Sequence, residues 1–271
     1  MPAGELEPTD APTGAIAVPP VPKAALVTGG AQRIGRTLAL TLAEEGFAVA
    51  VHHHRSRAAA ENLVEAIRNK GGTAVALAAD LGDEKAVKML LPLAERALGP
   101  IGCLINNAAV FADDTVETVT RESWDFHLAV NLRAPFVLIQ DLAARLPAGA
   151  GGAVVNMLDQ RVWSLTPYFL SYTLSKAGLW TLTQTMALAL APRIRVNGIG
   201  PGPALPSPRQ SPEQFARQCA MMPLRRGTSP QEIAAAMRFI LSAPAMTGQM
   251  IALDGGQHLG WAQPQRPPVI E

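Results

Sequence analysis

The chain is poor in cysteine and has no long apolar run. Of its 271 residues only Cys103 and Cys219 are cysteine, and they belong to no CxxC pair and no cysteine/histidine cluster. A disulfide framework and a zinc site are therefore not expected, and both thiols are expected to be ordinary buried side chains. No apolar run reaches the ~18 residues that a membrane span needs, and the start lacks the pattern of a secretory signal. We expect a cytoplasmic protein without a membrane partner.

Charge is also scarce and nearly balanced. The sequence has 23 basic and 22 acidic residues, a formal net charge of +1 and 17% charged residues. Such a chain has no overall field that would attract nucleic acid, which favours a small-molecule partner.

What the sequence does have is a large apolar fraction, 48%, arranged as alternating short and long segments. The proline- and alanine-rich ends, 1–22 and 261–271, predict disordered tails around a single domain at 23–260. Because short apolar runs alternate with amphipathic stretches, the pattern predicts an α/β fold with a doubly wound, parallel, seven-stranded sheet. The expected strands are 24–28, 48–52, 73–78, 103–106, 153–157, 195–199 and a last one near 249–253. The expected helices are 35–45, 58–70, 84–98, 124–145 and 168–190.

A glycine-rich segment, Thr28 to Gly35 (TGGAQRIG), follows the first expected strand directly. Glycine permits a tight turn there, and a helix starting near Arg33 offers free N–H groups to a pyrophosphate. Ordinary turn chemistry is the alternative for this segment alone.

The tip of the second expected strand reads HHHRSR, from His52 to Arg57. A carboxylate at this tip would accept the ribose 2′-OH of NAD, whereas a guanidinium beside a hydroxyl suits the 2′-phosphate of NADP. NADPH is therefore the expected cofactor. The alternative is that Arg55 and Arg57 begin a solvated helix while the histidines bind a metal or nothing. A shared metal is disfavoured because consecutive strand residues alternate faces, so no metal is expected. Asp80, after the third strand, has two equal interpretations: acceptor for the adenine amino group, or helix N-cap.

Tyr172 and Lys176 lie four residues apart in an expected helix, so their side chains share one face. A neighbouring ammonium is expected to lower the pKa of the phenol, as a general acid working near neutral pH requires. Alone, YxxxK is a weak pattern, and an exposed helix pair would be its ordinary explanation.

The motifs that accompany the Tyr/Lys pair are more specific than the pair alone. The glycine turn, 106–109 (NNAA), Asn131, the Tyr/Lys pair and 195–202 (RVNGIGPG) occur in one order. Together they resemble the short-chain dehydrogenase/reductase family over roughly residues 23–258. The resemblance implies a Rossmann-type domain in which Tyr172 donates a proton, Lys176 binds the nicotinamide ribose and Asn131 holds a proton-relay water.

The resemblance also implies a homotetramer, with helices 124–145 and 168–190 at an interface, and a mobile substrate lid at about 201–220. The implied cofactor contacts are Gly29, Arg33, Ile34, Gly35, His54, Arg55, Ser56, Asp80, Leu81, Asn107, Ala108, Tyr172, Lys176, Pro201 and Gly202.

One position departs from the common family pattern. Thirteen residues before Tyr172, where most of the family has a serine, stands Asp159. A carboxylate accepts hydrogen bonds and would repel a developing alkoxide, so it fits a substrate that presents N–H donors and a C=N bond to reduce. Capping of the loop after the fifth strand is the structural alternative for Asp159.

Four features look like those of pteridine reductases: Asp159 with the Tyr/Lys pair, Arg33 in the first loop, the His54-Arg55-Ser56 tip, and Phe111 as a ring that stacks on a pterin. The 254–259 ending (DGGQHL) is similar to dihydromonapterin reductases of the same branch. The resemblance implies an NADPH-dependent reduction of a pterin or folate. The implied substrate contacts are Arg33, Phe111, Asp159 and Tyr172.

Several alternatives stay open at this point. For Phe111 the alternative is a core residue, and for Arg33 it is a merely solvated residue of the first turn. The alternative activity is reduction of another carbonyl or imine substrate, in which Asp159 has drifted from serine without selecting pterins. In a different class of function, the chain is a catalytically silent NADPH-binding sensor or scaffold.

Overall fold

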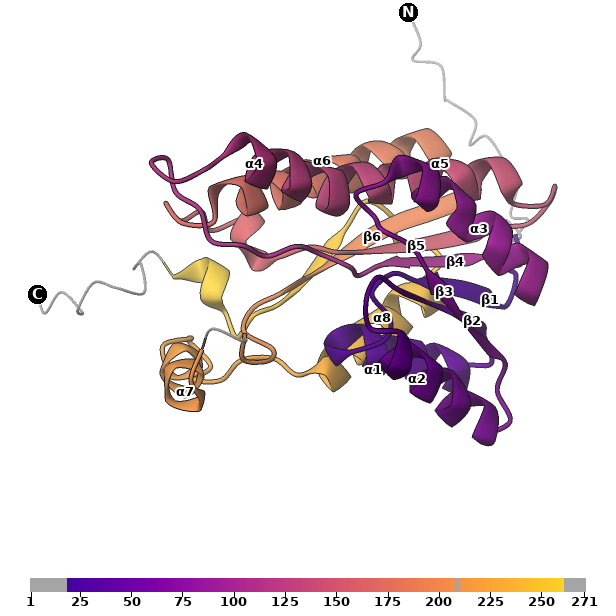
Figure 1. Ribbon diagram of the computed structural model, residues 1–271, viewed down its shortest axis with the longest axis horizontal. Coiled ribbons are helices and arrows are strands. Elements are labelled where there is room, and N and C mark those ends of the chain that lie inside the picture. Colours follow the sequence, from indigo (N-terminus) through magenta and orange to yellow (C-terminus); the bar gives the residue numbers. More distant parts are fainter. Residues whose placement is uncertain (1–18, 208–209, 261–271) are drawn as a thin grey trace, which may run out of the picture.

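The computed structural model describes residues 19–207 and 210–260 (Figure 1). The C-terminal tail predicted at 261–271 and most of the N-terminal one lie outside these ranges. The described residues that precede the first strand contact the domain, since Pro20 O accepts a hydrogen bond from Gly151 N at 3.0 Å.

Seven strands form one parallel sheet in the order β3-β2-β1-β4-β5-β6-β7, as the sequence predicted. The strand order turns outward in both directions from β1 and β4, which is the topological switch point of a doubly wound sheet. The strands are β1 Ala24–Val27, β2 Ala48–His53, β3 Ala74–Ala78, β4 Cys103–Asn106, β5 Gly152–Met157, β6 Ile194–Pro201 and β7 Met250–Leu253.

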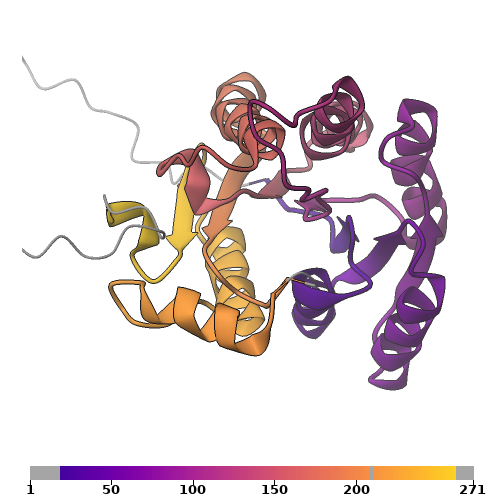
Figure 2. The ribbon, with the colours of Figure 1, turned by 60° about the vertical axis from the view of Figure 1, so that its left-hand side comes forward.

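Helices cover both faces of the sheet (Figures 1 and 2). The helices are α1 Arg33–Glu44, α2 Arg57–Asn69, α3 Glu84–Leu98, α4 Arg121–Leu128, α5 Ala134–Arg145, α6 Leu170–Leu190, α7 Pro212–Ala220 and α8 Pro230–Ser242. The hydrophobic core forms two layers, one on each face of the sheet, because alternate strand residues such as Val27 and Leu26 point to opposite faces. The first packs against α1, α2 and α8, and the second against α3, α5 and α6. Both faces are buried, which is why the strands are mostly apolar, with polar residues such as His52 and Asn106 near their carboxyl ends.

The helices differ from the predicted ones in three places: a π-helical turn interrupts one of them, and α7 and α8 were not predicted as helices. The helix predicted at 124–145 is interrupted by a π-helical turn, η1 Ala129–Arg133, between α4 and α5. Helix α8 was not predicted, although Ser229 caps its start by accepting from Glu232 N and Pro230 occupies the first turn. Within the described part of the chain, no helix has both the length and the apolar character that crossing a bilayer requires.

Candidate active site

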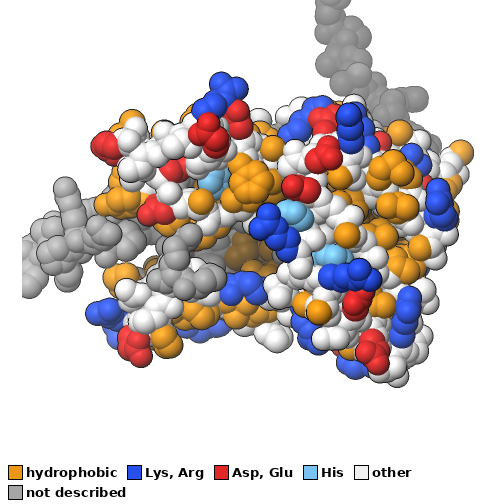
Figure 3. Space-filling view, in the orientation of Figure 1, with side chains coloured by type: hydrophobic (Ala, Val, Ile, Leu, Met, Phe, Trp, Pro, Cys, Tyr) orange, Lys and Arg blue, Asp and Glu red, His pale blue; other side chains and the backbone are white. Residues whose placement is uncertain are grey.

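A cleft of about 550 Å³ opens at the carboxyl ends of the central strands. Figure 3 shows its mouth as a hollow between the upper and lower helix layers, with basic and histidine side chains at the rim. Ligands of open α/β sheets bind at this edge, at the switch point. The predicted site residues that line it are Arg33, Ile34, Asn107, Phe111, Asp159, Tyr172, Lys176, Pro201 and Gly202.

The glycine turn forms one wall of the cleft. Gly29 has φ +59°, a conformation that L side chains rarely adopt, and a Cβ on Gly35 would collide with Gly29 O. Helix α1 begins at Arg33, and the side chain of its N-cap residue, Gln32, does not cap it. The first-turn N–H groups of α1 therefore remain available to an anion.

The turn is fastened to the end of β4. Thr28 Oγ1 accepts from Asn107 N at 2.9 Å and from Ala108 N at 3.1 Å. In return, Asn107 Nδ2 donates to Thr28 O at 2.9 Å and to Gly29 O at 3.1 Å. The NNAA segment thus holds the glycine turn in place.

His52, at the end of β2, is a second anchor, which the sequence did not identify. Its Nδ1 accepts from Gly29 N at 3.0 Å, and its Nε2 lies 3.2 Å from Ala79 O. Because Nδ1 is an acceptor here, the ring is neutral and Nε2 carries the proton. Burial lowers the pKa of His52 to about 4, as a neutral buried imidazole requires.

The tip of β2 lies beside the start of α1. Ser56 Oγ donates to Gln32 Oε1 at 3.3 Å, and His54 Nε2 lies 3.8 Å from Asp80 Oδ2. Arg55 is exposed, whereas Arg57 donates to Glu61 one turn along α2 at 2.7 Å. The N-cap interpretation of Asp80 is wrong, because Asp83 caps α3 and Asp80 Oδ1 accepts from Gly82 N within the preceding turn.

Tyr172 and Asp159 meet at the floor of the cleft. The Tyr172 hydroxyl donates to Asp159 Oδ2 at 2.9 Å, and Asp159 Oδ1 accepts from Arg161 N at 2.8 Å. The capping interpretation of Asp159 is therefore confirmed, because one oxygen caps η2 (Gln160–Val162), while the other oxygen faces Tyr172.

Two buried groups, Tyr172 and Lys176, have shifted pKa values. Burial, followed by the Asp159 carboxylate, raises the pKa of Tyr172 well above its usual value. The expectation that Lys176 lowers it is therefore wrong for this arrangement. Lys176 Nζ donates to Met157 O at 2.6 Å and lies 5.8 Å from the centroid of the Tyr172 ring. Burial lowers the pKa of Lys176 itself to about 8.

Aromatic rings form another wall of the cleft. Phe111 stacks on Phe169 with centroids 4.4 Å apart, and its ring meets Tyr172 edge-on at 4.7 Å. Phe111 is 39% exposed, so the core alternative is wrong. Phe169 and Arg161 also line the cleft and were missed. Their position between Asp159 and Tyr172 in the sequence was the available signal.

Asn131 does not line the cleft but supports it from behind. Its Nδ2 donates to Val110 O and to Ser175 Oγ, both at 3.0 Å, while its Oδ1 accepts from Val110 N at 2.8 Å. His127 Nε2 accepts from Ala112 N at 3.1 Å. The backbone on both sides of Phe111 is therefore clamped.

The strand β6 leads into the segment predicted to be a lid. Arg33, on the opposite side of the cleft, donates through Nη2 to Pro206 O at 3.1 Å and to Leu205 O at 3.4 Å. Arg33 is thus more than a solvated residue of the first helical turn. Helix α7 lies within the same predicted segment.

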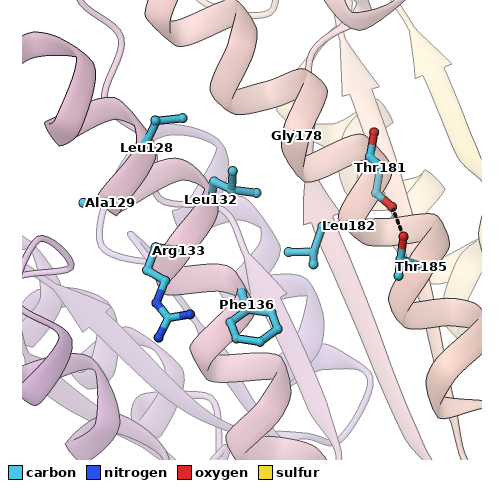
Figure 4. Close-up of a pocket in the computed structure, with 9 residues that line it drawn as sticks. All are labelled: Leu128, Ala129, Leu132, Arg133, Phe136, Gly178, Thr181, Leu182 and Thr185. Carbon is cyan, nitrogen blue, oxygen red and sulfur yellow. Dashed lines mark hydrogen bonds between the residues drawn. The ribbon is translucent and has the colours of Figure 1, made fainter.

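A second, more apolar cavity of about 500 Å³ lies on the outer helix layer, away from these side chains (Figure 4). Leu128, Leu132 and Phe136 line it from α4, η1 and α5, and Gly178 and Leu182 from α6. It therefore sits on the two helices for which the sequence predicted an interface.

Known proteins of two kinds are similar to this chain: members of a reductase family and proteins of known structure with bound NADP. A family model described as enoyl-(acyl carrier protein) reductase matches residues 29–258. The crystal structure of FolM alternative dihydrofolate reductase 1 from Brucella suis in complex with NADP is 48% identical. It covers 92% of this chain and 99% of its own, with a TM-score of 0.86. The corresponding protein from Brucella canis, also complexed with NADP, is 47% identical with the same coverage, 92% and 99%, and a TM-score of 0.88.

A relative with a different activity is also similar. The 3-oxoacyl-[acyl-carrier-protein] reductase FabG of Staphylococcus aureus is 33% identical over 242 residues, which are 88% of this chain and 98% of that protein. Because the named activities differ, likeness alone does not select a substrate.

Proposed function

This chain belongs to the short-chain dehydrogenase/reductase family, and from that premise we propose that it uses NADPH to reduce a dihydropterin or dihydrofolate to the tetrahydro level. The observation that carries the proposal is the 2.9 Å hydrogen bond from Tyr172 to Asp159, beside the Phe111 ring that meets Tyr172 edge-on. It places a hydrogen-bond acceptor, rather than a second hydroxyl donor, beside the proton donor. The FolM enzymes support the same substrate class.

The cofactor fits the residues that are present. The uncapped start of α1 with Arg33 suits a pyrophosphate, and exposed Arg55 with Ser56 suits a ribose 2′-phosphate. Lys176 lines the cleft one helical turn after Tyr172, and its Nζ contacts Met157 O at the end of β5, so we assign it the nicotinamide ribose. When bound, NADPH supplies the hydride.

The residues of this chain handle the proton and the orientation of the substrate. Reduction of a C=N bond adds a hydride to carbon and a proton to nitrogen. The Tyr172 hydroxyl is protonated at neutral pH and is the proposed donor, but its raised pKa makes it a weaker acid than a free phenol, so release of its proton depends on the nearby ammonium of Lys176. The Asp159 carboxylate accepts N–H groups of the heterocycle, and it also returns a proton from water to Tyr172. The Lys176 ammonium stabilises the phenolate once the proton has left.

Phe111 supplies a flat surface for the ring. Offset stacking on an aromatic side chain contributes about 0.5 to 1.5 kcal/mol, and the clamped backbone of Val110 and Ala112 keeps the Phe111 ring oriented. The segment at about 201–220 closes over the substrate in this proposal, with Arg33 linking it to the cofactor wall.

The test is oxidation of NADPH by the purified protein with a panel of 7,8-dihydropterins and 7,8-dihydrofolate. We expect turnover that Tyr172→Phe abolishes while NADPH binding, followed by its fluorescence, persists. Absence of turnover across the panel in the wild type refutes the proposal. Activity that survives in Tyr172→Phe refutes the role of the phenol.

A second candidate is the reduction of a ketone, which the similarity to FabG favours. Here Asp159 would replace the usual serine without selecting pterins. Asp159→Ser then raises turnover of simple 3-oxoacyl substrates, whereas under the first proposal it lowers turnover of dihydropterins. The pair of assays on this one variant separates the two functions.

We also propose that the cavity between α5 and α6 is covered by a second copy of this chain, as part of a homotetramer. The support is its apolar lining by Leu132, Phe136 and Leu182 on two long helices (Figure 4).

A further inference from the structure

Arg161 lines the cleft but takes no part in the proposed reaction. It belongs to η2, the turn directly after Asp159, and its backbone N–H is bound to that carboxylate at 2.8 Å. Both oxygens of Asp159 are bound, one by Arg161 N and the other by the Tyr172 hydroxyl. The position of the Arg161 backbone, from which its side chain extends, is therefore fixed. The backbone of Arg161 is therefore anchored to the same carboxylate that binds Tyr172.

The guanidinium of Arg161 is only partly satisfied. Nη1 donates to Thr166 Oγ1 at 2.8 Å, and Cζ lies 5.0 Å from the centroid of the Phe169 ring. Its Nε is buried and has no partner among the described residues. None of the ion pairs within the described part of the chain includes Arg161. A half-buried cation with a spare donor is costly unless a ligand anion completes it.

The surroundings of Arg161 indicate which part of a ligand it meets. Its contacts are with Phe169, Thr166 and Asp159, and not with the glycine turn or the tip of β2, where the cofactor is expected. Phe169 separates Arg161 from Phe111, since it lies under the guanidinium and stacks on Phe111 at 4.4 Å. A ring stacked on the opposite face of Phe111 is therefore separated from the guanidinium by two aromatic rings, Phe169 and Phe111, although Arg161 lines the same cleft. Arg161 reaches a substituent of the ring rather than the ring itself.

We propose that Arg161 is a specificity residue that binds a carboxylate on the side chain of the substrate, so that the enzyme prefers a dihydrofolate, with its glutamyl tail, over a dihydropterin with a neutral side chain. A guanidinium donates in a fixed fork that matches a carboxylate, which an ammonium does not. This inference rests on the proposed function, because it divides the pterin and folate class that Asp159 selects.

The experiment compares 7,8-dihydrofolate with 7,8-dihydrobiopterin in the wild type and in Arg161→Met. Methionine keeps a long side chain and a favourable sulfur contact with Phe169, so the turn is preserved. Loss of a charge-assisted hydrogen bond is expected to raise the KM for dihydrofolate at least about tenfold. The KM for dihydrobiopterin and both kcat values are expected to change by no more than about twofold.

Two control variants isolate the geometry. Arg96→Met removes an exposed charge from α3, which contributes no residue to the cleft lining, and is expected to leave both KM values unchanged. Arg161→Lys keeps the charge without the fork and should recover only part of the affinity for dihydrofolate. Equal KM changes for the two substrates in Arg161→Met, or no change for dihydrofolate, overturn the inference.

Binding measured without turnover separates this inference from the proposed function. Calorimetry gives the Kd of folate and of biopterin for the protein saturated with NADP+. A wild type that reduces neither compound refutes the proposed function. Folate binding that Arg161→Met weakens while biopterin binding persists still supports the carboxylate site. Folate binding that is equal in wild type and Arg161→Met refutes it.

Discussion

The buried imidazole of His52 makes the stability of this protein depend on pH in a way that can be worked out. His52 is 2% exposed, accepts from Gly29 N–H and donates to Ala79 O, so it holds the glycine turn against the end of β3. Protonation would place a hydrogen on Nδ1, facing the Gly29 N–H. The perturbation is therefore simple acidification from pH 7 to pH 5.

The sign and size follow from the two states. Burial lowers the pKa of His52 from 6.5 to about 4 in the folded protein, so the unfolded chain takes up the proton first as pH falls. The stability contribution is complete above pH 6.5 and is lost as the pH falls from there toward 4. At 1.36 kcal/mol per pKa unit the full loss is about 3 kcal/mol, of which about 2 kcal/mol has gone at pH 5.

The assay is urea unfolding of wild type, His52→Asn and His54→Asn at pH 7 and pH 5. Asparagine can still accept from the Gly29 N–H but does not titrate, so His52→Asn should lose most of the pH dependence. His54 is exposed at the same tip, and its replacement should leave the dependence intact. If His52→Asn loses as much stability on acidification as the wild type, the assignment of a neutral, turn-holding imidazole is refuted.

Three further predictions concern cofactor, proton and assembly. Arg55→Ala should raise the KM for NADPH at least about tenfold and leave that for NADH nearly unchanged, because only NADPH has the 2′-phosphate. The value of kcat/KM should fall as pH rises through about 8, where buried Lys176 loses its proton. In Asp159→Asn this fall should move to lower pH, since the carboxylate raises the pKa of Lys176; an unmoved pH profile contradicts the coupling. Leu182→Glu, in the cavity between α5 and α6, should reduce the mass measured by light scattering, and an unchanged mass contradicts the proposed interface.

The sheet could be predicted from the sequence because its signals are local. Apolar runs of strand length, each followed by an amphipathic stretch, specify parallel strands covered on both faces, and the glycine turn marks the switch point. Helix α8 shows the limit, since it carries a good N-cap in Ser229 yet was not identified in the proline- and serine-rich surroundings of 201–230. The π-helical turn at η1 has no recognised sequence signal, because it extends an otherwise regular helical pattern.

Site residues could be predicted from the sequence only where they belong to a recognised motif. Phe169 takes a left-handed conformation, φ +58°, just before α6, and this turns its ring onto Phe111. Nothing in the order of residues indicates that direction, because β-branching, capping and periodicity do not specify side-chain orientation in a loop. The pKa of Tyr172 was predicted in the wrong direction for the same reason. Spacing along the helix showed Lys176 as its neighbour, whereas burial and the carboxylate of Asp159 depend on the folded arrangement.

Position 159 shows how one residue can change the chemistry while the fold is kept. The backbone of η2 needs an oxygen at its N-cap, and Asp159 Oδ1 provides it by accepting from Arg161 N. A serine in the same place would satisfy that need with its hydroxyl oxygen, since serine and aspartate are comparable N-caps. The two residues differ in what they present to the cleft: serine can donate to an oxygen that gains charge, whereas Asp159 Oδ2 can only accept. Exchange between them therefore leaves the turn intact and reverses the polarity beside Tyr172, from a group that can donate a hydrogen bond to one that only accepts, as the proposed reduction of a C=N bond requires.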